Sequence, residues 1–187
     1  MDYSIILDFA RQKNVRRWNG RKTLSEFNLL EHAGRVANIC RTIMSGVDLS
    51  DSIKLHVMEY ALLHDYPEVW LNDTPSPIKA RYPALDELLK SIESEILQPL
   101  ELELSPLVKW VVKLADILDC LYESLIELKL GVECAEFSSV VNNARITLFL
   151  STQRYGLVVD GDDMLRQLLN NALTLHDYLI NELGKEG

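Results

Sequence analysis

Residues 25–46, SEFNLLEHAGRVANICRTIMSG, carry the pattern that decides the fold. Apolar side chains return every three or four residues along this stretch, at Leu29, Ala33, Val36, Cys40 and Ile43. Because an α-helix has 3.6 residues per turn, this spacing gathers them on one face and predicts a helix from about Ser25 to Ser45. Gly46 follows, and glycine is a common residue just beyond a helix end.

The same helical period continues on both sides, and no stretch alternates apolar and polar residues as a half-buried strand does. A first helix is predicted around residues 5–10, and a third begins at the cap residue Ser50 and ends before Pro67. Further helices are expected over about 84–97, 106–131 (with Ser105 as cap and Pro106 at its first position), 134–155 and 162–183. With no repeat or linker in the chain, the sequence predicts an all-α fold and a single helical domain over residues 1–187.

The segment from Tyr66 to Pro83 breaks the helical pattern. It contains Pro67, Pro75, Pro77 and Pro83, and we expect no usable helix within it. Long irregular segments in compact domains are usually functional or disordered. This one also contains apolar residues such as Trp70 and Ile78, which a disordered linker would rarely hold. We therefore predict an ordered functional loop.

Charge and composition restrict the class of protein. The 187 residues carry a formal net charge of -9, which argues against binding to a nucleic-acid polymer, although a local basic cluster can still bind a small anion. No apolar run approaches the roughly 20 residues that cross a bilayer, so we expect no membrane contact. The start of the chain, with Asp2 and Asp8 in its apolar pattern, does not resemble a signal peptide. Since the three cysteines are widely spaced, a disulfide framework is not expected either, and the predicted location is cytoplasmic.

Two histidines lie on apolar helix faces and have two interpretations. His32 lies between Leu29 and Val36, and His64 shares a face with Val57 and Tyr60. Such a histidine is either a satisfied core residue or a metal ligand. Next to His64, Asp65 adds a carboxylate, and at the last turn of a helix both side chains can flank one ion beyond the helix end. Imidazole and carboxylate together suit divalent metals such as Mn²⁺, Co²⁺, Fe²⁺ or Zn²⁺.

Two other patterns show how little the spacing alone decides. The dipeptide recurs as His176-Asp177 in mid-helix, where we interpret it as a pair on the helix surface. Asp116 belongs to a charged stripe with three- and four-residue spacing, which comprises Lys109, Lys113, Asp116, Asp119, Glu123 and Glu127. That stripe can be a solvated helix face with i,i+4 charge partners, or Asp116 can be a metal ligand; periodicity does not choose between them.

Taken together, these segments resemble a known family. The chain reads Val15-Arg16-Arg17-Trp18, then Glu31-His32, His64-Asp65-x-x-Glu68, Asp73-x-Pro75-x-Pro77-x-Lys79 and Lys113-x-x-Asp116. In this order the segments resemble the HD-domain phosphohydrolases, and specifically the small bacterial HD-domain 5′-deoxynucleotidases. The match extends from about residue 14 to residue 127. It departs from the family at Asn72, where a glycine is usual.

The resemblance implies a metal-dependent active site. It makes His32, His64, Asp65 and Asp116 the ligands of one divalent ion, with Mn²⁺, Co²⁺ or Zn²⁺ ahead of Mg²⁺. It makes Glu68 and Asp73 the catalytic carboxylates that handle the attacking water and the departing oxygen. It assigns substrate binding to Arg17 and Lys79 at phosphate, and to Trp18 and Pro75 beside sugar or base. A small-molecule deoxynucleotide is the implied substrate.

Three functions remain open at this stage. The first is a 5′-deoxynucleotidase, which converts a deoxynucleoside 5′-monophosphate to deoxynucleoside and phosphate. The second, from the same HD superfamily, is a triphosphohydrolase of the dATP type. The third is a catalytically idle HD-fold module that binds nucleotides. Because dimers occur among the resembling enzymes, a homo-oligomer is expected in each case.

Overall fold

The computed structural model describes residues 4–184 and confirms the predicted all-α fold. Among these residues the only extended pairing is a single bridge between Arg16 and Asn28. The helices and 3₁₀ turns, in chain order, are α1 (Ser4–Arg11), η1 (Gln12–Asn14), α2 (Leu29–Ile43), α3 (Asp51–Leu63), α4 (Glu68–Leu71), α5 (Ser76–Arg81), α6 (Pro83–Leu97), η2 (Gln98–Leu100), α7 (Pro106–Lys129), α8 (Ala135–Arg154) and α9 (Asp163–Leu183). Asp2, which entered the signal-peptide argument, lies outside the described residues.

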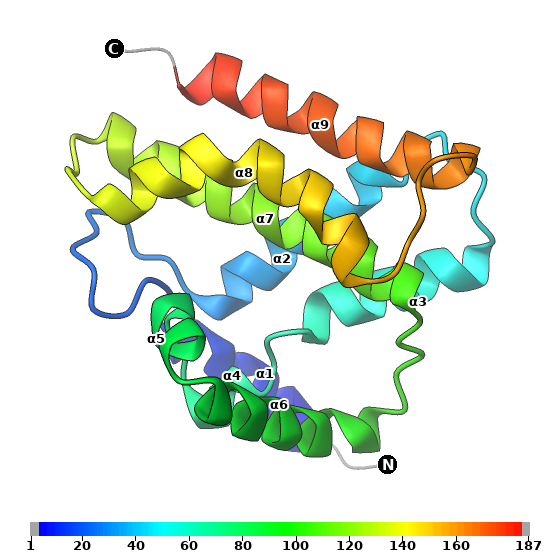
Figure 1. Ribbon diagram of the computed structural model, residues 1–187. Coiled ribbons are helices and arrows are strands. Elements are labelled where there is room, and N and C mark those ends of the chain that lie inside the picture. The colour runs from blue at the N-terminus through cyan, green and yellow to red at the C-terminus, as the bar shows by residue number, and fades with distance from the viewer. Residues whose placement is uncertain (1–3, 185–187) are drawn as a thin grey trace.

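Helix α7 is the centre of the arrangement. It packs against α2, α3, α8 and α9, and α8 and α9 run beside it along one side of the molecule (Figure 1). The short helices α4 and α5 gather with α1 and α6 on the opposite side (Figure 1). The chain before α2 and the turn after α3 both lie between these two groups, so residues distant in sequence can meet there.

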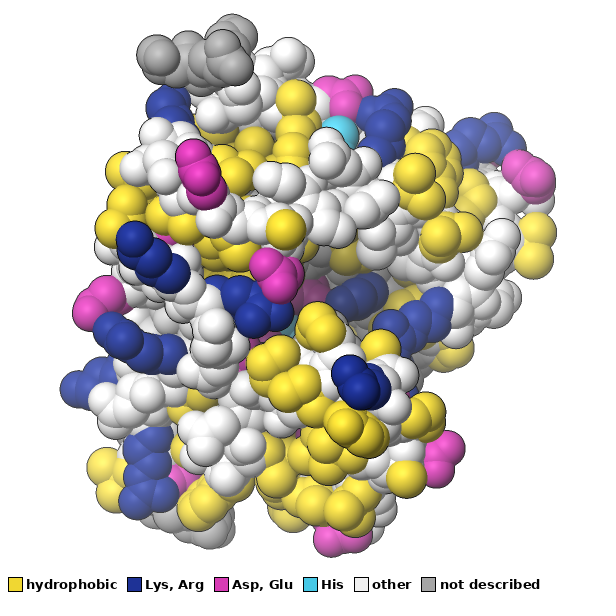
Figure 2. Space-filling model, turned by 60° about the vertical axis from the view of Figure 1, so that its left-hand side comes forward, with side chains coloured by type: hydrophobic (Ala, Val, Ile, Leu, Met, Phe, Trp, Pro, Cys, Tyr) yellow, Lys and Arg dark blue, Asp and Glu magenta, His cyan; other side chains and the backbone are white. Residues whose placement is uncertain are grey.

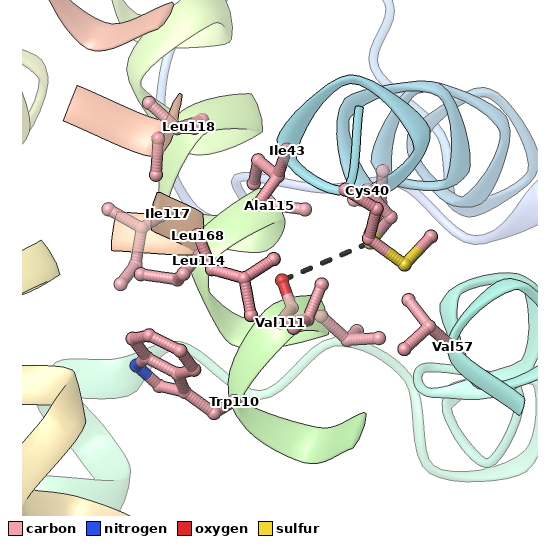
Figure 3. Packing of buried hydrophobic residues seen from close by; sticks show 14 of the residues in the cluster. Cys40, Ile43, Val57, Trp110, Val111, Leu114, Ala115, Ile117, Leu118 and Leu168 are labelled. Atoms are coloured by element: carbon pink, nitrogen blue, oxygen red, sulfur yellow. Dashed lines mark hydrogen bonds between the residues drawn. The ribbon is translucent and has the colours of Figure 1, made fainter. Parts of the chain in front are cut away.

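The core forms where α7 meets its neighbours (Figure 3). Trp110, Val111 and Leu114 of α7 are fully buried, as are Cys40 of α2 and Leu168 of α9. Burying an apolar side chain of this size stabilises the fold by roughly 1.5–3 kcal/mol. The one polar atom of the Trp110 ring donates to Ser151 Oγ at 3.0 Å, so the indole is buried without an unsatisfied donor. Helix α7 is therefore a rigid support for the polar residues on its other face.

Ser50 and Ser105 were predicted as helix caps, and the structure adds Asp162. Ser50, Ser105 and Asp162 each accept a hydrogen bond from a backbone N–H three residues ahead, and so begin α3, α7 and α9. Beyond α2, Gly46 has a φ of 73°, a left-handed conformation that glycine adopts without steric cost. No helix between residues 4 and 184 is both long and apolar enough to cross a membrane.

The start of α2 was predicted too early. The helix begins at Leu29 rather than near Ser25, with Asn28 as its cap. The preceding residues bond elsewhere: the Ser25 N–H donates to Glu127 Oε1 at 2.8 Å, and the Phe27 carbonyl accepts from the Arg17 N–H at 3.0 Å. The Phe27 carbonyl thus bonds outside the helix instead of accepting from a residue four ahead, and Glu127 holds the backbone at Ser25 before the helix begins.

The prediction of no helix between Tyr66 and Pro83 was also wrong. Helices α4 and α5 lie inside this segment, and α6 starts at Pro83. Pro67 precedes the first residue of α4, and Pro77 is the second residue of α5. In a first turn proline lacks only an N–H that would have no helical partner, so it starts these short helices instead of preventing them. The segment is ordered, as expected, but by helical turns.

Candidate active site

A cavity of about 490 Å³ opens between the two groups of helices. Figure 2 shows Lys and Arg side chains around a central hollow, with acidic and histidine atoms visible within it. The wall is formed by residues 17–21 before α2, the turn after α3, the segment 73–79, and one side of α7 and α8. All the residues for which the sequence predicted substrate binding or catalysis contribute to this wall: Arg17, Trp18, Glu68, Asp73, Pro75 and Lys79.

The four predicted metal ligands meet at one end of the cavity. His32 Nε2 lies 3.2 Å from His64 Nε2, 3.3 Å from Asp65 Oδ2 and 3.6 Å from Asp116 Oδ1. These residues come from three helices: α2 supplies His32, the end of α3 supplies His64 and Asp65, and α7 supplies Asp116. The structure thus brings together two imidazole nitrogens and two carboxylate oxygens, a donor set that first-row divalent ions accept.

Hydrogen bonds fix the orientation of both histidine rings. His64 Nδ1 lies 2.9 Å from the Ala61 carbonyl, which can only accept, so Nδ1 carries the proton and Nε2 keeps a lone pair. His32 Nδ1 lies 2.7 Å from Asp119 Oδ2, and a histidine bonded to a carboxylate in this way is a common arrangement behind metal ligands. Both Nε2 atoms therefore face the same point, and the residues fit a bound divalent cation.

The charges around this point depend on burial and on close partners. Burial and Arg17 act to lower the pKa of His32, but the hydrogen bonds with Asp119 and Asp65 and the negative charge of Asp65 act against them, and the pKa is raised to about 9. Burial lowers the pKa of His64. Burial also opposes ionisation of Asp65, yet the two histidines and Arg17 hold its pKa below the ordinary value. Because a metal-ligating histidine must be unprotonated at its donor nitrogen, a cation here would replace the proton on His32.

Lys113 holds Asp116 in a defined orientation. Its Nζ lies 2.6 Å from Asp116 Oδ2, which leaves Oδ1 toward His32. Burial acts to raise the pKa of Asp116, but Lys113 together with the two histidines more than offsets this, so the pKa lies below its ordinary value. Lys113 also lines the cavity. The sequence motif contained this lysine, but no function had been assigned to it.

Glu68 is the first residue of α4, which follows Asp65 closely, and Asp73 lies in the irregular turn between α4 and α5. Glu68 Oε2 is buried and has no hydrogen-bond partner among the described residues. Burial, together with the negative charges of Asp65 and Asp73, raises the pKa of Glu68 to about 9. Burial likewise raises the pKa of Asp73. A carboxyl group that is protonated near neutral pH can donate a proton, which is the property that a general acid needs.

Asn72 sets the direction of the chain between these two carboxylates. Its φ of 56° lies in a region that favours glycine, and its N–H closes α4 on the Glu68 carbonyl at 2.8 Å. Asparagine tolerates positive φ better than most residues, so it serves where the family usually has glycine. Asn19 Nδ2 then donates to the Asp73 carbonyl at 3.2 Å, which ties this turn to the segment before α2.

The predicted substrate residues face the cavity from two sides. Arg17 Nη1 lies 3.6 Å from Asp65 Oδ2, and its Nη2 lies 3.3 Å from the sulfur of Cys120. The Trp18 ring packs edge-on against Phe137 of α8, with centroids 4.7 Å apart. On the opposite side, Lys79 lies 4.0 Å from Glu93 of α6. Guanidinium and ammonium groups therefore flank the point where the four candidate ligands meet.

Sequence reasoning missed part of the cavity wall. Arg21 and Glu136 form an ion pair of 2.7 Å between the segment before α2 and the start of α8. Ser139 and Val140 of α8 and Cys120 of α7 also line the cavity. The family resemblance beyond residue 127 consisted only of predicted helices, so the α8 residues gave no signal. Their place follows from the packing of α8 on α7.

The charged stripe of α7 is not a solvated face. Asp119, Glu123 and Glu127 are all fully buried, so that interpretation was wrong. Arg35 of α2 explains the burial of the first two, because Nε bonds Asp119 Oδ1 at 2.6 Å and Nη2 bonds Glu123 Oε1. Glu127 accepts from the backbone N–H groups of Leu24 and Ser25. His32, Asp119 and Glu123 also approach one another closely enough to suggest a cation site, but the Arg35 guanidinium already supplies the positive charge there.

The second His-Asp dipeptide lies away from the cavity. Asp177 is exposed, as expected for a pair on the helix surface, and its Oδ1 lies 2.9 Å from His176 Nδ1. His176 itself is buried, so only half of the surface interpretation was right.

Comparison with known proteins gives consistent matches. A model of the family described as 5′-deoxynucleotidase YfbR-like matches residues 6–110. A dATP triphosphohydrolase of Cyanophage S-2L is 34% identical over 86 residues, 46% of this chain and 48% of that protein. A 5′-deoxynucleotidase of Vibrio atlanticus (strain LGP32) is 32% identical over 88 residues, 46% of this chain and 45% of that protein. Thus the matched stretch spans about half the length of these curated relatives.

Two solved structures share the fold. The HD phosphohydrolase DatZ of Cyanophage S-2L, bound to dA and one catalytic Zn²⁺ ion, matches with a TM-score of 0.74 and 21% identity over 94% of this chain and 96% of that one. An HD-domain phosphohydrolase from Listeria innocua matches with a TM-score of 0.66 and 21% identity, over 97% of both chains. The fold is therefore that of HD-domain phosphohydrolases along nearly the whole chain.

Proposed function

This chain belongs to the YfbR-like 5′-deoxynucleotidase family, and from that premise we propose that it is a metal-dependent deoxynucleotide phosphohydrolase. The simplest reaction is hydrolysis of a deoxynucleoside 5′-monophosphate to deoxynucleoside and phosphate. One observation carries the proposal: His32, His64, Asp65 and Asp116 converge at the cavity end beside a buried Glu68 that has a raised pKa. This combination joins a cation site to a proton donor in one cavity.

The four converging residues would hold one divalent ion. When bound, such an ion supplies Lewis acidity, which lowers the pKa of water and offsets charge on phosphoryl oxygens. The two imidazoles favour Zn²⁺, Mn²⁺ or Co²⁺ over Mg²⁺, which prefers a shell of oxygen ligands. The catalytic Zn²⁺ of the cyanophage relative supports zinc as the first metal to test.

Glu68 and Asp73 would handle the protons of hydrolysis. In the reaction a water oxygen forms a bond to phosphorus, the bond from phosphorus to the 5′ oxygen breaks, and that oxygen needs a proton. Glu68, whose pKa is raised to about 9, holds a proton at neutral pH and would give it to the departing oxygen. Asp73 lies on the same wall and would accept a proton from the attacking water.

The basic and aromatic wall would bind the substrate. Arg17 presents its two Nη groups as a planar pair suited to phosphate oxygens, and Lys79 adds a point charge from the opposite side. Trp18 and Pro75 offer flat apolar surfaces for sugar or base. These contacts would orient the phosphate toward the four ligand residues.

A dNTP triphosphohydrolase of the dATP type is the second candidate. The cavity wall includes four cations, Arg17, Arg21, Lys79 and Lys113, which could neutralise a longer phosphate chain. Similarity to the cyanophage dATP triphosphohydrolase supports this alternative as well. A nucleotide-binding module without catalysis is less favoured, because every position expected for a ligand or catalytic carboxylate is occupied by a suitable residue.

Other properties go with the proposal. We expect one HD domain over residues 1–187, a cytoplasmic location where deoxynucleotides occur, and a homo-oligomer. The strongly exposed apolar residues of α6, such as Leu88, are consistent with contact between copies. A nucleic-acid polymer is not expected as a partner, given the net charge of -9.

Phosphate release after metal removal tests the function. The chelated protein would receive Zn²⁺, Mn²⁺, Co²⁺ or Mg²⁺ and then each dNMP, dNTP and matching ribonucleotide, with products resolved by ion exchange. Activity on dNMPs alone would support the nucleotidase, and tripolyphosphate released from one dNTP would support the triphosphohydrolase. Nucleotide binding without turnover under any metal would overturn both and leave a binding module.

A further inference from the structure

Glu123 binds two neighbouring cavity residues with one carboxylate oxygen. Its Oε2 accepts from Arg17 Nε at 3.1 Å and from Trp18 Nε1 at 2.8 Å. The other oxygen, Oε1, accepts from Arg35 Nη2. Glu123 is fully buried on α7 and does not itself line the cavity. Any effect of Glu123 on a ligand must therefore act through the residues that it holds.

We propose that Glu123 is a positioning residue, which holds Arg17 and Trp18 as one unit with the guanidinium and the indole ring aimed into the cavity. The inference rests on the proposed function in one respect, since it takes these two residues to contact the deoxynucleotide. It adds a buried residue whose role is to orient them.

The backbone at Trp18 needs such a partner. Trp18 has a φ of 59°, in the left-handed region that bulky residues rarely adopt. A turn closes there, because the Arg21 N–H donates to the Trp18 carbonyl at 2.9 Å. The indole N–H then has a charged acceptor in Glu123, and the ring edge rests on Phe137. Both contacts hold the ring on the cavity wall although the backbone conformation is unfavourable.

The orientation of Arg17 follows from the same carboxylate. With Nε directed at Glu123, the two Nη groups turn away from it, toward Asp65 and the Cys120 sulfur. Asp65 and Cys120 both belong to the cavity wall, so both Nη groups lie beside it. A guanidinium held by Nε presents its Nη pair in a fixed plane, and a phosphate can accept from such a pair with two parallel bonds.

Burial raises the pKa of Glu123, and the guanidinium groups of Arg17 and Arg35 act against that rise. A carboxylate without charged partners would be costly inside the protein, whereas Glu123 lies between the guanidinium groups of Arg17 and Arg35. Arg35 also bonds Asp119, and Asp119 bonds His32. One connected set of buried charges therefore supports both the candidate substrate residues and a candidate metal ligand.

Nitrogen-15 NMR of the tryptophan indole groups tests the contact without any turnover. The chain has three tryptophans in different settings: Trp18 bonds Glu123, Trp110 bonds Ser151, and Trp70 is 55% exposed. In metal-free Glu123→Gln we expect the Trp18 indole resonance, assigned with Trp18→Phe, to move while the Trp110 resonance stays in place. An unmoved Trp18 resonance would overturn the proposal.

Steady-state kinetics with the metal-loaded enzyme test the positioning role. Glu123→Gln removes a charge-assisted acceptor, so we expect KM for a dNMP to rise about ten- to a hundredfold, with a smaller change in kcat. The matched control is Glu127→Gln, because Glu127 is equally buried one turn later but its carboxylate, among the described residues, bonds only the backbone N–H groups of Leu24 and Ser25. We expect its KM to remain within about twofold of wild type. Equal effects of the two substitutions would indicate a merely structural role and overturn the proposal.

Two further measurements distinguish failure of this proposal from misfolding of the variant and from failure of the proposed function. If Glu123→Gln does not fold, Trp18→Phe serves instead: it removes the indole N–H that bonds Glu123, together with one ring of the side chain, and a KM unchanged from wild type would count against the proposal. If the wild-type protein hydrolyses no deoxynucleotide, the proposed function fails by itself. Calorimetric binding of a dNMP to wild type, Glu123→Gln and Glu127→Gln then replaces KM, and the same ten- to hundredfold difference between the two variants is expected.

Discussion

The tetrapeptide Leu-His-Asp-Tyr occurs twice in this chain, as residues 63–66 and as residues 175–178, with different outcomes. The first copy is followed by Pro67, α3 ends at Leu63, and His64 and Asp65 turn toward His32 and Asp116. The second copy is followed by Leu179, and α9 continues through it to Leu183. The same four residues thus form half of a candidate metal site where a helix ends, and a local pair where it continues.

The neighbours of each copy account for the difference. Asp65 is surrounded by two histidines and Arg17, and these offset its burial. Asp177 is exposed and lies beside Arg145 of α8. A carboxylate at a helix end within a cavity can meet groups from several elements, whereas one in mid-helix meets its own helix and the helix packed beside it. The setting, more than the dipeptide, determines whether a metal site forms.

The largest expected effect comes from removing the carboxylate in each copy. Asp65→Ala should lower kcat/KM about a thousandfold or more, because Lewis-acid catalysis is worth several kcal/mol. Asp177→Ala should stay within about twofold of wild type. Phosphate release under saturating metal measures both, with circular dichroism as a check on folding. Comparable losses in the two variants would mean that the second copy also serves catalysis and would break the comparison.

Next in size is the effect of Glu68, the carboxylate two residues beyond the first copy. Glu68→Gln should lower kcat by about 10²- to 10⁴-fold, the range for loss of a general acid. Glutamine keeps the shape of the side chain but cannot give up a proton, so metal affinity should remain near that of wild type. Calorimetric titration with Zn²⁺ provides that control. A parallel loss of zinc binding would assign Glu68 to the metal site instead of to proton transfer.

Metal addition should stabilise the folded protein only when the carboxylate of the first copy is present. A cation that binds only the folded state stabilises it by about 2.7 kcal/mol at a hundredfold excess over its Kd, which corresponds to roughly 5–10 °C in Tm for a chain of this size. We expect this increase on adding Zn²⁺ to metal-free wild type and to Asp177→Ala, but not to Asp65→Ala. Scanning calorimetry measures it. An equal increase in all three would place the stabilising ion elsewhere.

Much of the fold could be predicted from local chemistry. The caps Ser50 and Ser105 begin helices because their side chains bond nearby backbone groups, which sequence alone reveals. Helices α4 and α5 were missed because prolines were taken only as helix breakers, although Pro67 and Pro77 lie where a helix tolerates them. The start of α2 was misplaced because the Phe27 carbonyl accepts from the Arg17 N–H of the preceding segment, while Glu127, about a hundred residues away, holds the Ser25 backbone outside the helix.

The candidate site could be predicted only in part, for a similar reason. The resemblance named the residues that now meet at the cavity, since those motifs are read along the chain. Periodicity could not reveal that Glu123 and Asp119 are buried, because their partner Arg35 belongs to another helix. Nor did it reveal Glu136, which reaches the cavity through the packing of α8 on α7. Contacts between segments that are distant in the chain could not be predicted from this one sequence.

The smallest effect is expected at the second copy itself. The pKa of Asp177 is lowered by its hydrogen bond with His176 and by Arg145. A carboxyl group with a lowered folded pKa stabilises the protein above its unfolded value, near pH 4, and the stabilisation is lost as pH falls through the folded pKa. Because Asp177 and Arg145 are both half-exposed and screened by solvent, we expect Asp177→Asn to cost well under about 1 kcal/mol at pH 7, and less at an acid pH at which the carboxyl group is protonated. Urea unfolding of the metal-free protein at both pH values measures this loss of stability. A larger loss at pH 7 would show that Asp177 stabilises the fold more than its exposed position predicts.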